Sequence, residues 1–114
     1  MFCISIVIPK LLAEAVRKEG VRIWVTGCAT GEEAYSIAIL FHEAAQECGF
    51  TEKISIFATD AHAGSLRIAA NGVYDISRLG QISPEHRERY FQEIAPDQFK
   101  VSPELRRMVV FALH

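Results

Sequence analysis

Apolar residues concentrate in three short, mostly apolar runs along the chain, at Val21–Thr26, Ile54–Ala58 and Met108–Leu113. Runs of this length and composition are typical of strands buried inside a parallel sheet. Between the first two runs, apolar residues recur at helical spacing from Gly31 to about Gly49. This pattern predicts an α/β fold of the Rossmann-like type, in which about three parallel strands are flanked by helices.

A short helix is predicted after the second apolar run. Residues 62–71 suit a helix because Asn71-Gly72 supplies a left-handed cap at its end. Tyr74 and Ile76 follow the cap. We expect these two residues to lead into a loop.

Another helix start lies at Ser83-Pro84-Glu85, with serine as the N-cap and proline at the first helical position. We expect this helix to run to about Ile94. The expected packing residues are Tyr90, Phe91 and Ile94. The charged face, which includes Arg87 and Arg89, is either a solvated surface of mixed charge or a docking surface for an acidic partner.

The C-terminal part contains two brief elements before the third apolar run. Gln98–Val101 is predicted as a short strand, and Ser102-Pro103-Glu104 starts a turn that continues through Arg106. The chain then divides into an N-terminal linker with a helix, residues 1–20, and one incomplete domain, residues 21–114. A length of 114 residues suits a single domain.

The N-terminal stretch Met1–Leu12 is apolar but too short to span a bilayer, and it lacks the basic region and cleavage site of a signal peptide. Pro9 starts a predicted helix over Lys10–Lys18. We therefore expect no membrane insertion.

Charge and cysteine content exclude several classes of function. The net charge of −2, without a basic stripe, argues against nucleic acid as a partner. The three cysteines, Cys3, Cys28 and Cys48, are scattered and form no C-x-x-C pair, so no metal site is predicted. Reduced thiols of this kind are expected in a cytoplasmic protein.

The turn after the first strand, Gly27–Gly31, consists mostly of small residues and opens directly into a helix. It lacks the spacing of G-x-G-x-x-G and the lysine of a P-loop. Glu32 and Glu33 place negative charge where a pyrophosphate would otherwise bind. The turn thus favours a positively charged nucleoside without phosphate, a description that S-adenosylmethionine fits. Alternatively, both glutamates only stabilise the helix N-terminus.

Asp60 closes the second predicted strand. In a Rossmann-like unit, an acidic residue at this place reaches the ribose hydroxyls of the ligand. The alternative is that Asp60 is the N-cap of the helix that begins near residues 61–65. Taken together with the glycine turn, the ligand-binding interpretation is favoured.

Five co-linear segments carry a resemblance to a known family. They are GCATGEEAYSIA from Gly27, FATD ending at Asp60, NGVY at Asn71–Tyr74, SPEHRERYF at Ser83–Phe91 and ELRRMVVF at Glu104–Phe111. From about Val21 to His114 the chain resembles the chemotaxis-receptor methyltransferases of the CheR type. The resemblance implies methyl transfer from S-adenosylmethionine to glutamate side chains of methyl-accepting chemotaxis receptors.

The resemblance also implies which residues bind the cofactor. Gly27 and Ala29 would line it, Glu33 would be its acidic contact at the helix start, and Asp60 would bind the ribose, with Glu32 a weaker candidate. No catalytic residue is implied, because the sulfonium methyl is already activated and a glutamate carboxylate is ionised at pH 7.

Two further positions of the family pattern bear on how much of the family's cofactor site this chain contains. An arginine that lies close to the cofactor in the family has its place at Cys3 here, and an asparagine that contacts the cofactor would follow His114. We expect the chain to be the N-terminal half of the catalytic domain, with self-association through an exposed sheet edge. Two alternatives remain, a non-catalytic module that binds S-adenosylmethionine or its product, and a structural remnant that binds nothing.

Overall fold

The computed structural model describes residues 20–50 and 53–114. The helix expected over Lys10–Lys18 and the place of Cys3 lie outside these residues. None of the helices in the two described ranges is both long and apolar enough to cross a membrane.

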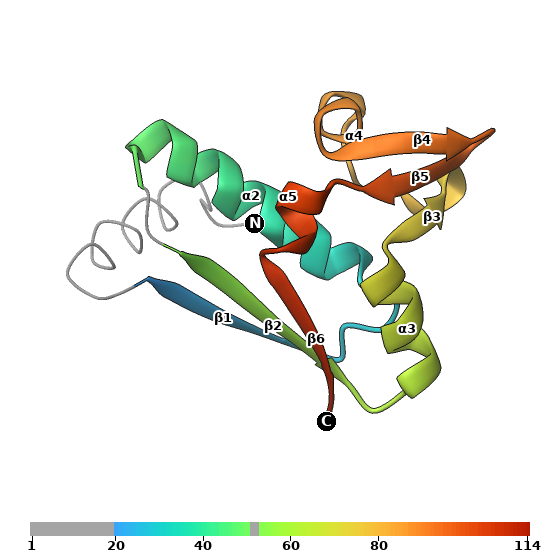
Figure 1. Cartoon of the computed structure of the whole chain (residues 1–114), viewed down its shortest axis with the longest axis horizontal. Coiled ribbons are helices and arrows are strands. Elements are labelled where there is room, and N and C mark those ends of the chain that lie inside the picture. The colour runs from blue at the N-terminus through green and yellow to red at the C-terminus, as the bar shows by residue number, and fades with distance from the viewer. Residues whose placement is uncertain (1–19, 51–52) are drawn as a thin grey trace.

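Three strands form a parallel sheet, β1 (Val21–Thr26), β2 (Ile54–Asp60) and β6 (Val109–Leu113) (Figure 1). β2 lies in the middle, and both of its neighbours run parallel to it. The prediction of three parallel strands in a partial Rossmann-like α/β fold is thus confirmed. Because the strands are parallel, their carboxyl ends meet at one edge of the sheet.

Helices α2 (Glu32–Cys48), α3 (Ala63–Asn71) and α5 (Pro103–Arg106) share one hydrophobic core with this sheet. The long helix α2 is bounded by Gly31 and Gly49, as expected, and both glycines have left-handed backbone angles, with φ 94° at Gly31 and 66° at Gly49. Its buried face is made largely of alanines, which let the helix lie close to the strands. The buried residues of α2 are Ala34, Tyr35, Ala38, Ile39, Phe41, Ala44 and Ala45.

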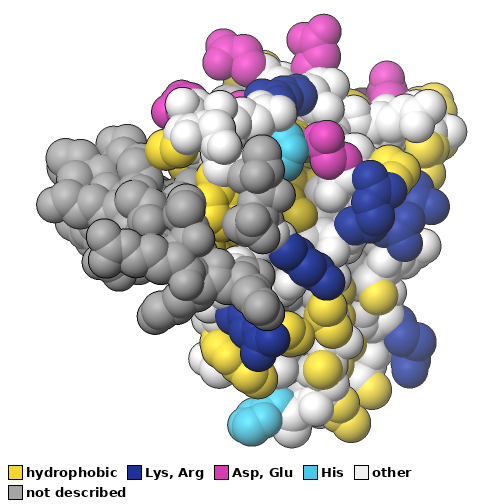
Figure 2. Space-filling model, turned by 60° about the vertical axis from the view of Figure 1, so that its left-hand side comes forward, with side chains coloured by type: hydrophobic (Ala, Val, Ile, Leu, Met, Phe, Trp, Pro, Cys, Tyr) yellow, Lys and Arg dark blue, Asp and Glu magenta, His cyan; other side chains and the backbone are white. Residues whose placement is uncertain are grey.

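The opposite face of the sheet is open among the described residues. Trp24, Phe57 and Val110 are neighbours across the three strands, and the rings of Trp24 and Phe57 stack 5.4 Å apart. Trp24 is 68% exposed and Val110 is 49% exposed. The expectation that β1 and β6 are fully buried is therefore wrong, because the helices described above all pack on the other face. Hydrophobic side chains are visible in the lower part of the face drawn in Figure 2.

A second, antiparallel sheet was not predicted. It consists of β3 (Val73–Asp75), β5 (Gln98–Val101) and β4 (Phe91–Ala95), in the order β3-β5-β4, and lies at the upper right of Figure 1. A two-residue turn, Pro96-Asp97, joins β4 to β5. Asp97 has a φ of 59°, a conformation that aspartate tolerates better than most residues. Of these strands, only Gln98–Val101 was predicted.

Helix α4 (Pro84–Tyr90) begins as predicted, with the Ser83 side chain accepting a hydrogen bond from the His86 N–H. The expectation that it runs to about Ile94 is wrong. Phe91 already has extended backbone angles, φ −130° and ψ 151°, because it pairs with β5. Ile94 is 50% exposed and does not pack in the core, whereas Tyr90 and Phe91 are buried as expected.

Tyr74 and Ile76 lead into a loop over residues 79–83, as expected, but both lie in regular elements themselves. Tyr74 lies in β3 and is buried, and Ile76–Arg78 forms a short 3₁₀ helix, η1. The Asp75 side chain accepts a hydrogen bond from the Ser77 N–H and so starts this turn.

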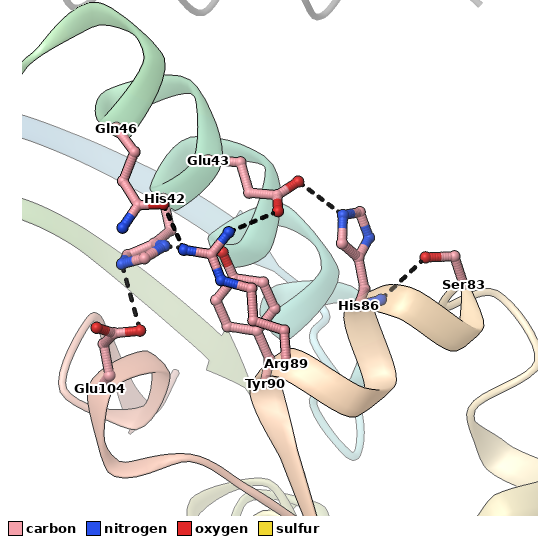
Figure 3. Close-up of polar contacts among 8 residues, drawn as sticks. All are labelled: His42, Glu43, Gln46, Ser83, His86, Arg89, Tyr90 and Glu104. Atoms are coloured by element: carbon pink, nitrogen blue, oxygen red, sulfur yellow. Dashed lines mark hydrogen bonds and ion pairs between the residues drawn. The ribbon is translucent and has the colours of Figure 1, made fainter.

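Polar side chains fasten α4 and α5 to α2 through what we call the histidine cluster (Figure 3). Its members are His42, Glu43, Gln46, His86, Arg89, Tyr90 and Glu104. Glu43 accepts hydrogen bonds from His86 at 2.6 Å and from Arg89 at 3.1 Å. His42 lies 2.8 Å from the hydroxyl of the fully buried Tyr90, and burial raises the pKa of Tyr90 to about 12. Arg89 is thus engaged within its own chain.

Candidate functional site

The candidate site lies where β1 and β2 end. Thr26 and Thr59 are paired across the two strands, so the turn after β1 and the residue after Thr59 start side by side. The turn is tight because its backbone enters the left-handed region at Gly27 (φ 65°), Ala29 (φ 49°) and Gly31 (φ 94°). Glycine adopts this conformation at little cost, whereas Ala29 is held in it.

Hydrogen bonds from the turn to β2 hold this geometry. The Cys28 N–H donates to the Thr59 carbonyl at 3.0 Å, and the Ala29 N–H donates to Oδ2 of Asp60 at 2.9 Å. The predicted meeting of the glycine turn with the acid of the second strand is therefore present in the structure.

Asp60 also accepts a hydrogen bond on Oδ1 from the His62 N–H at 2.9 Å. The two backbone hydrogen bonds, first from His62 and then from Ala29, lower the pKa of Asp60, so its carboxylate is ionised at neutral pH. A carboxylate has about four acceptor positions, and these contacts use two of them. The alternative that Asp60 is an N-cap is wrong, because His62 caps α3 by accepting from the Ser65 N–H.

The two glutamates at the start of α2 have different surroundings. Glu32 accepts a hydrogen bond from the Thr30 hydroxyl and one from Arg78 Nε at 2.9 Å. Burial alone would raise the pKa of Glu32, but hydrogen bonds from Thr30, its own backbone N–H and Arg78 outweigh burial and lower it. Glu33 is exposed. Only Glu33 therefore presents a carboxylate that the turn does not already hold.

A cavity of about 490 Å³ opens beside the turn. One wall is formed by the turn and the first residues of α2, and the other by η1 and the loop after it. The lining residues are Gly27, Cys28, Ala29, Thr30, Glu32, Glu33, Ser36, Ser77, Arg78, Gly80, Gln81 and Ile82. Its volume falls within the range of small-molecule sites. Asp60 is not part of the wall and meets the turn through Ala29.

The η1 side of this cavity was not predicted from the sequence. Arg78 donates from Nη2 to the Thr30 hydroxyl at 2.8 Å, and the Tyr74 hydroxyl donates to the Thr30 carbonyl at 2.5 Å. These contacts join residues more than forty positions apart in the chain. No local pattern predicts them. The one available clue was Asp75 two residues before Ser77, a spacing that favours a turn rather than an open loop.

The residues present suit a nucleoside-type ligand. A Cβ added at Gly27 would meet nothing within 4 Å, so the backbone there faces open space that a ligand can enter. Parallel strands, a small-residue turn at the carboxyl end of the first and an acid at the end of the second define the nucleotide-binding class of α/β proteins.

Comparison with known proteins gives the family. Residues 2–114 match the family described as CheR methyltransferase, SAM binding domain. The chain belongs to this family, whose cofactor is S-adenosylmethionine. The resemblance noted from the sequence is thereby confirmed.

Individual relatives agree with this assignment. The chain is 36% identical over 110 residues to the chemotaxis protein methyltransferase of Vibrio parahaemolyticus, covering 94% of the chain and 40% of that relative. It is 38% identical over 109 residues to chemotaxis protein methyltransferase 2 of Pseudomonas aeruginosa, covering 89% of the chain and 38% of that relative. An uncharacterized 104.1 kDa protein in the hypE 3′ region of Rhodobacter capsulatus is 37% identical over 108 residues, covering 95% of the chain and 11% of that protein. The chain thus spans at most about 40% of these relatives.

Proposed function

We propose that this chain is the cofactor-binding part of a protein-glutamate O-methyltransferase that acts on methyl-accepting chemotaxis receptors. The observation that carries the proposal is the hydrogen bond between Ala29 and Asp60, which joins the glycine turn to the acid of β2 beside a cavity. The receptor as substrate rests on relatives named chemotaxis protein methyltransferases.

Each candidate residue has a distinct role in this proposal. The backbone at Gly27 and Ala29 lies against the cofactor, because small residues let it approach closely. The free acceptor positions of Asp60 take hydrogen bonds from the ribose hydroxyls. Glu33 faces a positively charged part of the ligand. S-adenosylmethionine, when bound, supplies a methyl group on a positively charged sulfur.

The reaction requires little acid–base catalysis from the protein. A glutamate carboxylate is already ionised at pH 7, so no residue is needed to remove a proton. What the site must supply is orientation of the carboxylate in line with the methyl group and exclusion of water.

The decisive experiment measures cofactor binding in the Asp60→Ala variant. Calorimetric titration with S-adenosylhomocysteine should show an affinity roughly tenfold or more below that of the parent chain, since hydrogen bonds to a charged group are lost. Glu88→Ala, which removes an exposed acid on α4, is the matched control and should bind normally. Equal affinity in the parent chain and Asp60→Ala would remove Asp60 from the site.

A second candidate function is cofactor binding without catalysis. It is favoured because the proposal assigns every candidate residue, Glu33 and Asp60 included, to the cofactor and none to a protein substrate. A methyl-transfer assay on receptor fragments separates the two candidates. Binding of S-adenosylhomocysteine without methyl transfer would support the second, and no binding at all would leave a structural remnant.

We further propose that the chain self-associates in the cytoplasm. β1 and β6 are the edges of the described sheet, and exposed Trp24 and Val110 lie on these edge strands. Cys28 and Cys48 are free thiols, which suits a reducing compartment. Light scattering that shows a monomer at all concentrations would contradict the self-association.

A further inference from the structure

Arg78 occupies an unusual place in the cavity beside the glycine turn. It comes from η1, and its guanidinium reaches the turn on the opposite wall. Nε donates to Oε2 of Glu32 at 2.9 Å, and Nη2 donates to the Thr30 hydroxyl at 2.8 Å. Thr30 is itself fixed through its carbonyl by the Tyr74 hydroxyl. The guanidinium is therefore held in one orientation at two points.

These two contacts leave one edge of the Arg78 guanidinium free to bind a ligand. An arginine has five N–H donors arranged as a rigid fork. The contacts to Glu32 and Thr30 use the edge formed by Nε and Nη2. Within residues 20–50 and 53–114, no acceptor contacts Nη1, and the Arg78 side chain is 54% exposed. The edge formed by Nη1 and Nη2 can thus donate two hydrogen bonds to a carboxylate in the bidentate geometry that such pairs favour.

Glu32, the acidic partner of Arg78 within the chain, does not occupy all of the hydrogen-bond donors of Arg78. Glu32 shares its carboxylate between Arg78 and the Thr30 hydroxyl, so it contacts Nε alone. Glu32 nevertheless cancels much of the positive charge at long range. Attraction of an anion to Arg78 therefore depends on directed hydrogen bonds at short range rather than on net charge.

We propose that Arg78 is a carboxylate-binding residue of this cavity, held in register with the glycine turn by Glu32 and Thr30. The proposal deepens the function proposed above and rests on it, because the ligand is identified by that site. Two carboxylates are chemically suitable, the amino-acid carboxylate of the cofactor and the side chain of a substrate glutamate. Glu33 lines the same cavity and offers the opposite charge, which suits a ligand that carries both signs.

The test compares three ligands by calorimetry on the full chain. S-adenosylhomocysteine carries the amino-acid carboxylate, 5′-methylthioadenosine lacks the whole amino-acid part, and glutarate imitates a glutamate side chain. Arg78→Gln should weaken binding of the relevant carboxylate ligand by roughly ten- to a hundred-fold and leave 5′-methylthioadenosine unchanged. Arg107→Gln, which removes an exposed arginine outside this cavity, is the control and should match the parent chain.

The pattern of losses identifies the source of the carboxylate. A loss confined to S-adenosylhomocysteine assigns Arg78 to the cofactor, and a loss confined to glutarate assigns it to the substrate side chain. Arg78→Lys keeps the charge without the fork, so full affinity in that variant would overturn the bidentate geometry. Unchanged binding of both carboxylate ligands in Arg78→Gln, or an equal loss for 5′-methylthioadenosine, would overturn the proposal.

The same titrations can refute the proposed function and the Arg78 proposal separately. If the parent chain binds neither S-adenosylhomocysteine nor 5′-methylthioadenosine, the cofactor site is refuted, whereas glutarate binding still tests Arg78. Arg78-dependent glutarate binding would then support the carboxylate site alone. No glutarate binding in that case would refute both.

Discussion

Helix α2 carries polar clusters at its two ends, and they differ in how completely their charges are used. Near the C-terminal end, both oxygens of Glu43 are taken by His86 and Arg89 in the histidine cluster (Figure 3). At the N-terminal end, Glu33 and Arg78 line a cavity and keep hydrogen-bonding capacity toward it. Both clusters connect α2 to the part of the chain that forms the second sheet.

Charged residues therefore have different roles in the two clusters. In the histidine cluster, charged groups satisfy one another around the buried Tyr90, so their main effect is to hold α4 against α2. At the glycine turn, the Glu32 carboxylate is hydrogen-bonded within the chain and orients Arg78. The Glu33 carboxylate is not held in this way. A group with unused donors or acceptors that faces a cavity is the better candidate for ligand binding.

The strongest test of this comparison is Tyr90→Ala. Removing a fully buried aromatic side chain should lower the free energy of unfolding by about 3–5 kcal/mol, as for other large-to-alanine changes. Tyr90→Phe, which loses only the contact with His42, should cost about 1 kcal/mol. Urea unfolding measures both. If folded Tyr90→Ala also lost affinity for S-adenosylhomocysteine, the two ends of α2 would not be independent.

A smaller loss of stability is expected at the other end of the helix, from Gly31→Ala. A Cβ there would lie 2.7 Å from the Ala69 Cβ and 3.2 Å from its Cα, and the φ of 94° is unfavourable for alanine. The combined strain and overpacking should cost about 2–4 kcal/mol.

The control for Gly31→Ala is Gly80→Ala, where an added Cβ meets nothing within 4 Å and stability should change little. Because Gly31 ends the turn, its variant should also weaken cofactor binding, which Tyr90→Ala should not. Equal unfolding free energies for Gly31→Ala and Gly80→Ala would show that the turn adjusts freely.

The parts of this molecule that the sequence predicts are those whose pattern is local. The apolar run of β1, the helical spacing of α2 and the left-handed cap at Gly72 each lie within a few consecutive residues, and each was found. β4 was missed because four of its five residues are exposed, so no alternation marks it as a strand. It is a strand because it pairs with Gln98–Val101.

The candidate site divides in the same way. The proximity of Gly27 and Ala29 to Asp60 could be predicted because they lie at or just after the ends of recognisable strands, and topology brings strand ends together. Arg78 was missed because its partner Glu32 is 46 residues earlier in the chain. A contact between a 3₁₀ helix and a distant helix start leaves no periodic trace in the sequence.

The smallest expected effect concerns the pH dependence of stability at the turn. Thr30 and Arg78 help to lower the pKa of Glu32 below its ordinary value of 4.5. A group whose pKa is lower in the folded state stabilises the fold above its ordinary pKa, and this contribution is lost as the pH falls through the lowered value. The melting temperature of the parent chain should therefore fall as the solution is acidified below about pH 4.5.

Glu32→Gln removes this titration and should show a shallower fall in melting temperature over the same pH range. Asp60 and Asp75, whose pKa values are also lowered by hydrogen bonds, remain in the variant, so part of the acid sensitivity should persist. Glu33→Gln is the matched control, because its carboxylate is exposed at the adjacent position. Parallel curves for the parent chain and Glu32→Gln would mean that Glu32 does not hold Arg78 strongly in solution. The orientation of the guanidinium on which carboxylate binding depends would then have to come from Thr30 alone.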